Sequence, residues 1–177
     1  VGLEERAKLL NELGQALIRH KYMFEFGDAL RPGNLFDYFL QRQEKGVLAA
    51  REILIAILKS MGEIWPDGSW VDSIAIGDAA YHEAVKRSDI TDRIVPFHKL
   101  SQWMSYSLIE PLQLAGIKII HLDALTGLAE YRNGGLFIDT GTISLRDKTE
   151  METLHDPKSP LIVEWLSLIH ISEPTRR

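Results

Sequence analysis

The chain has 177 residues, of which 45% are hydrophobic, and it carries a formal net charge of −5 at pH 7. This apolar fraction excludes an intrinsically disordered chain, and the acidic balance disfavours non-specific nucleic-acid binding, which relies on Lys and Arg to neutralise phosphates. The absence of cysteine excludes disulfides, thiolate zinc sites and cysteine nucleophiles, so we expect a cytoplasmic protein. The longest apolar run, Ile53 to Leu58, is far shorter than the about 20 residues of a membrane helix, and no membrane partner is expected.

Helical periodicity dominates the first sixty residues. Leucines recur at helical spacing from Leu3 to His20 and predict a half-buried helix. A turn at residues 31–34 ends on Asn34, which we expect to cap a helix that includes Leu35 to Phe39. The apolar residues of Val47 to Met61 run all round a helix, which predicts deep burial.

The middle of the chain has shorter elements. Residues 62–77 predict a loop with a short extended piece at Ser73 to Ile76. Asp78 is a capping residue type, and we expect a short helix to follow it as far as Lys86. Residues 87–96 are polar and turn-like.

A long helix is predicted from Phe97 to about Ala115 and should end at Gly116. Pro111 lies inside it and should kink or divide it. A short strand is expected at Ile117 to Ile120.

The last third of the chain predicts less regular structure. Residues 123–145 are rich in glycine and are expected to be irregular, and a final helix begins at Ser159-Pro160. The sequence therefore predicts a mainly α, multi-helical fold with short irregular or extended segments.

The Phe97 helix carries a polar face. His98, Gln102 and Tyr106 lie four residues apart and stack along the helix, with Lys99 beside them. Such a set of side chains, next to a glycine-rich loop, suits a polar ligand that bears a phosphate. The spacing alone favours a plainer interpretation, a solvated helix face with a capping histidine.

The segment from Leu125 to Gly135 is the second candidate. Its glycines let the backbone approach a ligand and expose N–H groups to an anion. The side chains that we expect to bind the ligand are Tyr131, Arg132 and Asn133. The candidate catalytic carboxylates are Glu130, Asp139 and Asp123. A surface loop with an ordinary Glu130–Arg132 ion pair is an equally good interpretation of the residues alone.

Patterns typical of other enzyme classes are missing. His82-Glu83 has no second histidine four positions on, so the zincin pattern fails. The chain has no Gly-x-Ser-x-Gly elbow and no dinucleotide fingerprint, and its aspartates lack the spacing of a calcium loop. We expect no metal and no cofactor.

Several stretches together resemble the uracil-catabolism family of the ribosylurea (URC) pathway, a family long catalogued as a domain of unknown function. They are residues 31–33, 35–38, 64–66, 97–103, 106–112, 125–140 and 163–165. The resemblance implies a part in uracil breakdown. Its members carry a substantial further N-terminal portion.

A more distant resemblance links two of these stretches to the queuosine-salvage nucleosidases. Those enzymes carry a Phe-His-Lys-x-x-Gln helix and an Ala-Asp-Tyr-Arg segment. The matching residues here are Phe97, His98, Lys99, Gln102, Ala129, Glu130, Tyr131 and Arg132. This resemblance implies hydrolysis of an N-glycosidic bond on a DNA-glycosylase-like helical fold. Glu130 replaces the family's aspartate, and Asn133-Gly134-Gly135 replaces its Pro-Gln ending.

The two resemblances together imply an N-ribosyl hydrolase whose substrate is a phosphorylated riboside of the ribosylurea type. Lys99 and Arg132 would hold the 5′-phosphate, and Glu130 would stabilise positive charge on the ribose. His98 and Gln102 would bind ribose hydroxyls or the leaving urea. Two alternatives stay open: another hydrolase of the same pathway, and a non-catalytic protein that binds or senses a pyrimidine nucleotide.

The two ends of the chain suggest a fragment. It opens on Val1 inside an amphipathic pattern, and residues 166–176 match one reading frame of a sequencing adapter. We expect residues 1–165 to be the C-terminal part of a single helical domain and residues 166–177 to be a non-native tail.

Overall fold

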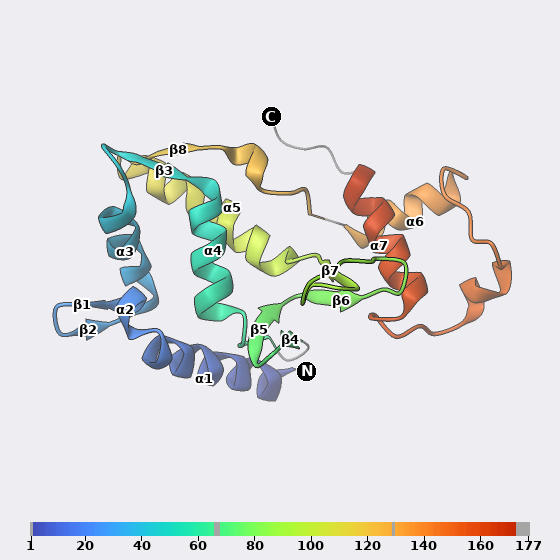
Figure 1. The fold of residues 1–177 in the computed structure, drawn as a ribbon, viewed down its shortest axis with the longest axis horizontal. Helices are drawn as coiled ribbons and strands as arrows, with labels where there is room; N and C mark the ends of the chain where they lie inside the picture. Colours follow the sequence, from blue (N-terminus) through green and yellow to red (C-terminus); the bar gives the residue numbers. More distant parts are fainter. Residues whose placement is uncertain (1, 66–67, 129, 173–177) are drawn as a thin grey trace.

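The computed structural model describes residues 2–65, 68–128 and 130–172. Seven α-helices dominate this part of the chain, and its strands form only two-stranded pairs. Figure 1 shows α6 and α7 at one end, α1 to α4 at the other, and β6 and β7 between them. The predicted mainly α class is confirmed, whereas the DNA-glycosylase-like arrangement stays a prediction. In the described residues no helix has the length and apolar character that crossing a membrane requires.

The first quarter of the chain folds as three helices around a small hairpin. Its elements are α1 (Leu3–Arg19), α2 (Lys21–Phe24), β1 (Glu25–Phe26), β2 (Ala29–Leu30), a 3-10 turn (Pro32–Asn34) and α3 (Leu35–Arg42). The predicted helices are present, but the side chain of Asn34 does not cap α3. Its amide instead donates to the carbonyls of Phe24 at 2.9 Å and Ala29 at 2.7 Å. Asn34 therefore fixes the hairpin against α2.

A parallel strand pair begins the central part. The elements are β3 (Val47–Ala49), α4 (Ala50–Met61) and β8 (Lys118–Ile120), and β3 pairs with β8. The prediction of one helix from Val47 to Met61 is wrong for its first three residues, because an apolar run fits a buried strand as well as a helix. The predicted strand at β8 is confirmed. The main core is packed around α4 and includes Phe24, Phe39, Leu48, Ile53 and Ile57.

Two antiparallel pairs fill the middle. They are β4 (Ser69–Val71) with β5 (Ile74–Gly77), and β6 (Ala79–Tyr81) with β7 (Ile94–Pro96). The predicted helix from Asp78 to Lys86 is therefore wrong. Ala79 to Tyr81 pair with a strand that follows more than ten residues later, a partner that local propensity does not reveal.

Helix α5 (Lys99–Leu114) is the longest element after α1. His98 precedes it in the left-handed conformation with φ of 50°, so the helix begins two residues later than predicted. Pro111 lies inside α5 and does not divide it. Gly116, with φ of 89°, follows its end as expected.

The C-terminal third contains two helices that pack on each other. A 3-10 turn (Leu122–Ala124) leads to α6 (Tyr131–Asp139), and a second 3-10 turn (Lys148–Glu152) leads to α7 (Pro160–Ser172). The predicted irregular segment 123–145 is wrong over α6. We predicted irregular structure throughout this segment because Gly134 and Gly135 have low helix propensity. Packing against α7 overrides that propensity.

A second, smaller core joins this pair of helices to the rest of the chain. It consists of Ala80, Phe97, Val163, Leu166 and Ile169. Leu166 and Ile169 belong to the segment predicted to be a non-native tail, and both are buried. The origin of residues 166–177 stays a prediction, and the tail from residue 173 onward lies outside the described residues, as does Ala129.

Gly134 is the point of closest approach between α6 and α7. A Cβ added there would lie 2.5 Å from Trp165 Cε2 and even closer to Ile169 Cδ1. We predict that Gly134→Ala lowers the free energy of unfolding by about 1–3 kcal/mol through overpacking. Gly135 has nothing within 4 Å of its added Cβ, so Gly135→Ala is the matched control and should stabilise by about 0.5–1 kcal/mol. Urea denaturation of both variants measures the difference, and equal midpoints would contradict this packing.

Candidate functional site

A cleft of about 320 Å³ lies where the two cores meet. Trp65 lines it and packs on the main core, while Phe97 and Leu166 line it from the second core. The polar and charged side chains of the lining are Asp78, Lys99, Tyr131 and Lys158. Four secondary-structure elements meet here: β6, the start of α5, the start of α6, and α7. Residues from distant parts of the sequence thus form one concave surface.

Lys99 is the central cation of the cleft. Its Nζ lies 4.0 Å from the centroid of the Tyr131 ring, and that ring lies 5.7 Å from the Trp165 ring. Burial lowers the pKa of Lys99, whereas the negative charges of Asp78 and Glu130 raise it. A half-buried ammonium group over an aromatic face interacts more strongly with an anion than an exposed lysine does, because solvent screens it less.

Asp78 organises the start of α5. Its backbone carbonyl accepts the N–H groups of Phe97 at 3.2 Å and His98 at 2.8 Å. Its carboxylate Oδ2 accepts the N–H of Lys99 at 3.1 Å. Asp78 is thus the cap of a helix that begins 21 residues later, and the sequence prediction assigned it to the wrong helix. Only the pairing of β6 with β7 reveals this role, since that pairing brings the two segments together.

Glu130 lies beside Lys99 at the first turn of α6. Its Oε1 accepts both the backbone N–H and the Nε–H of Arg132, each at 3.3 Å. These two hydrogen bonds are the main reason that the pKa of Glu130 is lowered, and the carboxylate is ionised at neutral pH. Arg132 is 89% exposed and does not line the cleft. Glu130 therefore supplies a fixed negative charge, which suits electrostatic stabilisation better than proton donation.

Gln102 and Tyr106 support the site without lining the cleft. The Gln102 amide donates to Thr126 Oγ1 at 2.7 Å, and its oxygen accepts the Thr126 N–H at 3.2 Å. The Tyr106 hydroxyl donates to the Thr126 carbonyl at 3.0 Å. This face of α5 is not solvated, because Gln102 is 5% exposed. Both side chains fix the loop that leads to Glu130.

The structure separates His98 from Lys99. His98 lines a different cavity, of about 450 Å³, together with His20, Glu63 and Trp70. Burial lowers the pKa of the His98 imidazole, although the charge of Asp78 raises it. His98 and Lys99, which are adjacent in the sequence, therefore line two different cavities.

The remaining candidate carboxylates lie elsewhere. Asp123 lines a third cavity, of about 860 Å³, beside the ends of β3 and β8. Asp139 is exposed at the last turn of α6, about 13 Å along the helix from Glu130. Asn133 is partly buried in the first turn of α6 and does not line the cleft. Of the three predicted catalytic carboxylates, only Glu130 lies close to Lys99. Among the residues described, no three His, Asp or Glu side chains converge on a possible metal position.

Comparison with known proteins places the chain in a family. The model of a family described as "Protein of unknown function (DUF1688)" matches residues 1–171. The chain belongs to this family. Of similar proteins, Uracil catabolism protein 4 of Lachancea kluyveri is 39% identical over 157 residues, covering 82% of this chain and 35% of that protein. Protein urg3 of Schizosaccharomyces pombe is 34% identical over 174 residues, covering 94% of this chain and 38% of that protein.

The DUF1688 chain thus spans little more than a third of the length of these curated relatives. The predicted resemblance to the uracil-catabolism family is confirmed. We found no match among solved structures. The similarity to queuosine-salvage nucleosidases stays a prediction.

The hydrogen bonds of Gln102 predict a structural role. Gln102→Met retains the volume of the side chain but leaves Thr126 without two partners, and should lower the free energy of unfolding by about 1–3 kcal/mol. Tyr106→Phe removes one bond to the same loop and should cost about 0.5–1.5 kcal/mol. Urea denaturation of both variants is the measurement. A Gln102→Met protein that keeps its stability but loses ribose 5-phosphate binding would show that Gln102 contacts the ligand instead.

Proposed function

We propose that this chain belongs to an N-ribosyl hydrolase of uracil catabolism and contributes the cleft around Lys99 to its active site. The substrate proposed is a phosphorylated riboside of the ribosylurea type. The name of the Lachancea kluyveri relative, Uracil catabolism protein 4, supports the pathway. The observation that carries the proposal is the position of Lys99 over the Tyr131 ring, within the electrostatic influence of Glu130.

Lys99 is suited to hold the phosphate. Its ammonium is partly desolvated and its position is fixed by the Tyr131 ring, so little freedom is lost when an anion binds. Lys158 lines the same cleft and adds a second positive charge. A cleft of about 320 Å³ falls at the small end of the range for ligand pockets, as expected for a ribose phosphate with a small leaving group.

Glu130 is suited to the ribose. Cleavage of an N-ribosyl bond leaves the electron pair on nitrogen and develops positive charge on the sugar ring, as in glycoside hydrolysis. An ionised carboxylate stabilises that charge and orients the attacking water. The oxygen of water then bonds to the anomeric carbon, and its proton ends on the departing urea.

A non-catalytic nucleotide-binding or sensing protein is the second candidate. The exposure of Glu130 favours it, because 46% of this side chain is accessible to water, which screens its charge. Such a protein would use the same cations to bind phosphate. The two functions differ in whether product is released.

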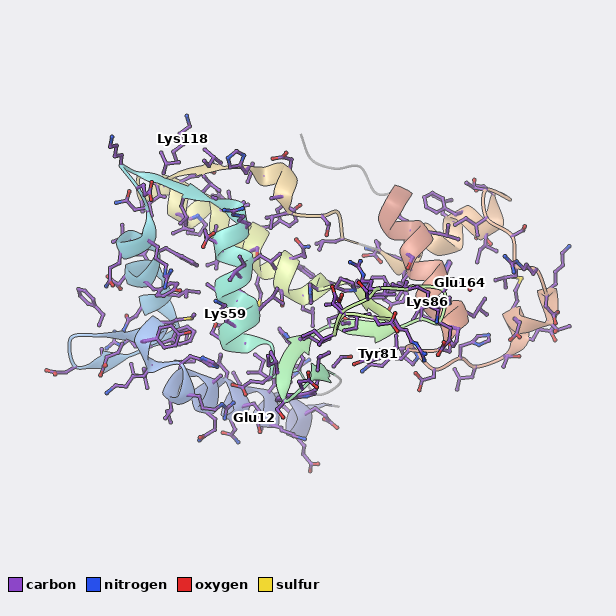
Figure 2. All side chains as sticks on the ribbon, viewed as in Figure 1. Glu12, Lys59, Tyr81, Lys86, Lys118 and Glu164 are labelled. Atoms are coloured by element: carbon purple, nitrogen blue, oxygen red, sulfur yellow. The ribbon has the colours of Figure 1, made fainter. Side chains whose placement is uncertain are left out.

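Lys99 provides the first test. Lys99→Met should weaken the binding of ribose 5-phosphate at least tenfold, and Lys99→Arg should restore part of it because the charge returns. Because the pKa of Lys99 is lowered, binding should weaken as the pH rises, starting below the pH at which an ordinary lysine loses its proton. Lys118→Met is the control, since Lys118 is exposed on β8 at the opposite end of the molecule from α6 and α7, as Figure 2 shows. Titration calorimetry gives the affinities. Equal affinity for wild type and Lys99→Met would remove Lys99 from the phosphate site.

Glu130 provides the second test. N-ribosylurea 5′-phosphate is incubated with this chain and, in parallel, with a full-length relative, and urea and ribose 5-phosphate are followed by mass spectrometry. We expect both products, and we expect Glu130→Gln to lower turnover about 100-fold with little change in binding, since glutamine can still cap α6. Asp139→Asn is the matched control at the far end of α6. Tight binding without products would favour the sensor, and full activity of Glu130→Gln would show that another group stabilises the charge.

A further inference from the structure

Asp78 is the charged residue of the cleft to which the proposed function assigns no part. It lies between β5 and β6, is partly buried, and lines the cleft together with Lys99 and Tyr131. Its backbone carbonyl and its carboxylate together accept three N–H groups from Phe97, His98 and Lys99. The residue therefore has an evident structural role, and the question is whether that role requires its charge.

The hydrogen bonds do not require a carboxylate. Two of them use the backbone carbonyl, which every residue type possesses. The third uses a side-chain oxygen, which asparagine also offers, and asparagine caps helices about as well as aspartate. The charge of Asp78 interacts favourably with the N-terminal end of α5 and with Lys99, and from the cleft lining it can also act on a bound ligand.

The charge of Asp78 acts across the cleft. It raises the pKa of Lys99, opposing the effect of burial, and it adds to the burial that raises the pKa of the Tyr131 hydroxyl. Lys99 thus has carboxylates from two different elements near it, Asp78 before β6 and Glu130 before α6. The two differ in environment, since Glu130 is exposed and held by Arg132 while Asp78 lines the cleft.

We infer that Asp78, the carboxylate that lines this cleft, faces the ribosyl part of the ligand, whereas Glu130 lies outside the lining. The inference rests on the proposed function for the identity of that ligand. A partly desolvated carboxylate stabilises positive charge on a ribose ring more strongly than an exposed one. Asp78 acts through its charge alone: the N-ribosyl bond breaks with its electron pair on nitrogen, water supplies the new oxygen bond and the proton, and Asp78 neither gains nor loses an atom.

The same position next to Lys99 makes Asp78 a repulsive neighbour for a bound phosphate. Removing its charge should therefore have opposite effects on two measurements. Binding of the product-like anion should become tighter, because Lys99 is no longer partly neutralised. Turnover should fall, because the charge that develops on the ribose loses its counterpart. A purely structural residue would change both in the same direction.

The experiment compares Asp78→Asn with Asp78→Ala, made in this chain and at the aligned position of a full-length relative. For Asp78→Asn we expect ribose 5-phosphate to bind about three- to tenfold more tightly and turnover of N-ribosylurea 5′-phosphate to fall about 100-fold, with the melting temperature retained. Asp78→Ala should show the same changes in binding and turnover together with a lower melting temperature, because the cap of α5 is lost. Asp89→Asn is the matched control: its exposed carboxylate also accepts a backbone N–H, that of Thr91 at 2.8 Å, and it does not line the cleft.

Two results would overturn the inference. Unchanged affinity and turnover in Asp78→Asn would show that the charge is unused, and weaker affinity together with lost stability would show a structural role only. If the wild-type proteins release no product, the proposed function fails instead. The affinity for ribose 5-phosphate then still tests the position of the Asp78 charge. Tighter binding by Asp78→Asn would place that charge beside the bound anion, and unchanged binding would show that Asp78 lies outside the anion site.

Discussion

The antiparallel pairing of β6 with β7 is the constraint on which the cleft depends. It places Asp78 against the first turn of α5 and places Phe97 in the second core. The β6–β7 pairing thus sets the direction of α5 through Asp78 and the position of α7 through Phe97. A helix beginning at Lys99 is otherwise left with unpaired N–H groups at its first turn, since His98 provides no side-chain cap. The segment 78–98 contains no helix, yet it determines where α5 begins and how the second core is assembled.

A second layer of support comes from α5 itself. Gln102 and Tyr106 both bind Thr126, so the loop that leads from β8 towards Glu130 is attached to the same helix that carries Lys99. The cation and the nearby carboxylate thus share one rigid support. Helix α5 packs on the main core, and Phe97 just before it belongs to the second core. The cleft thus lies at a junction between packed units, where ligand sites often form.

The sequence predicted the parts of this fold that depend on local periodicity. The structure contains the predicted helices near Leu3, Lys99 and Pro160 and the predicted strand near Ile119. The spacing of apolar residues within each segment is enough to predict these elements, whatever they pack against. It failed at β6, whose partner strand is more than ten residues away, and at α6, whose two glycines argue against a helix. In the site, Lys99, Glu130 and Tyr131 were found through their resemblance to known motifs. Asp78 was missed because a cap acting across 21 residues leaves no local pattern, and Asp123 and Asp139 were grouped with Glu130 only by nearness in the chain.

The contacts of the Tyr131 ring with Lys99 and with Trp165 have an optical consequence. Two of the four tryptophans of the chain belong to this region, since Trp65 lines the cleft and Trp165 contacts the Tyr131 ring. The ammonium of Lys99 polarises the tyrosine face, and any anion that draws that charge towards itself changes the field at the neighbouring indole. The native emission of these rings should therefore change when an anion enters the cleft, which would give the protein an intrinsic reporter beside its candidate site.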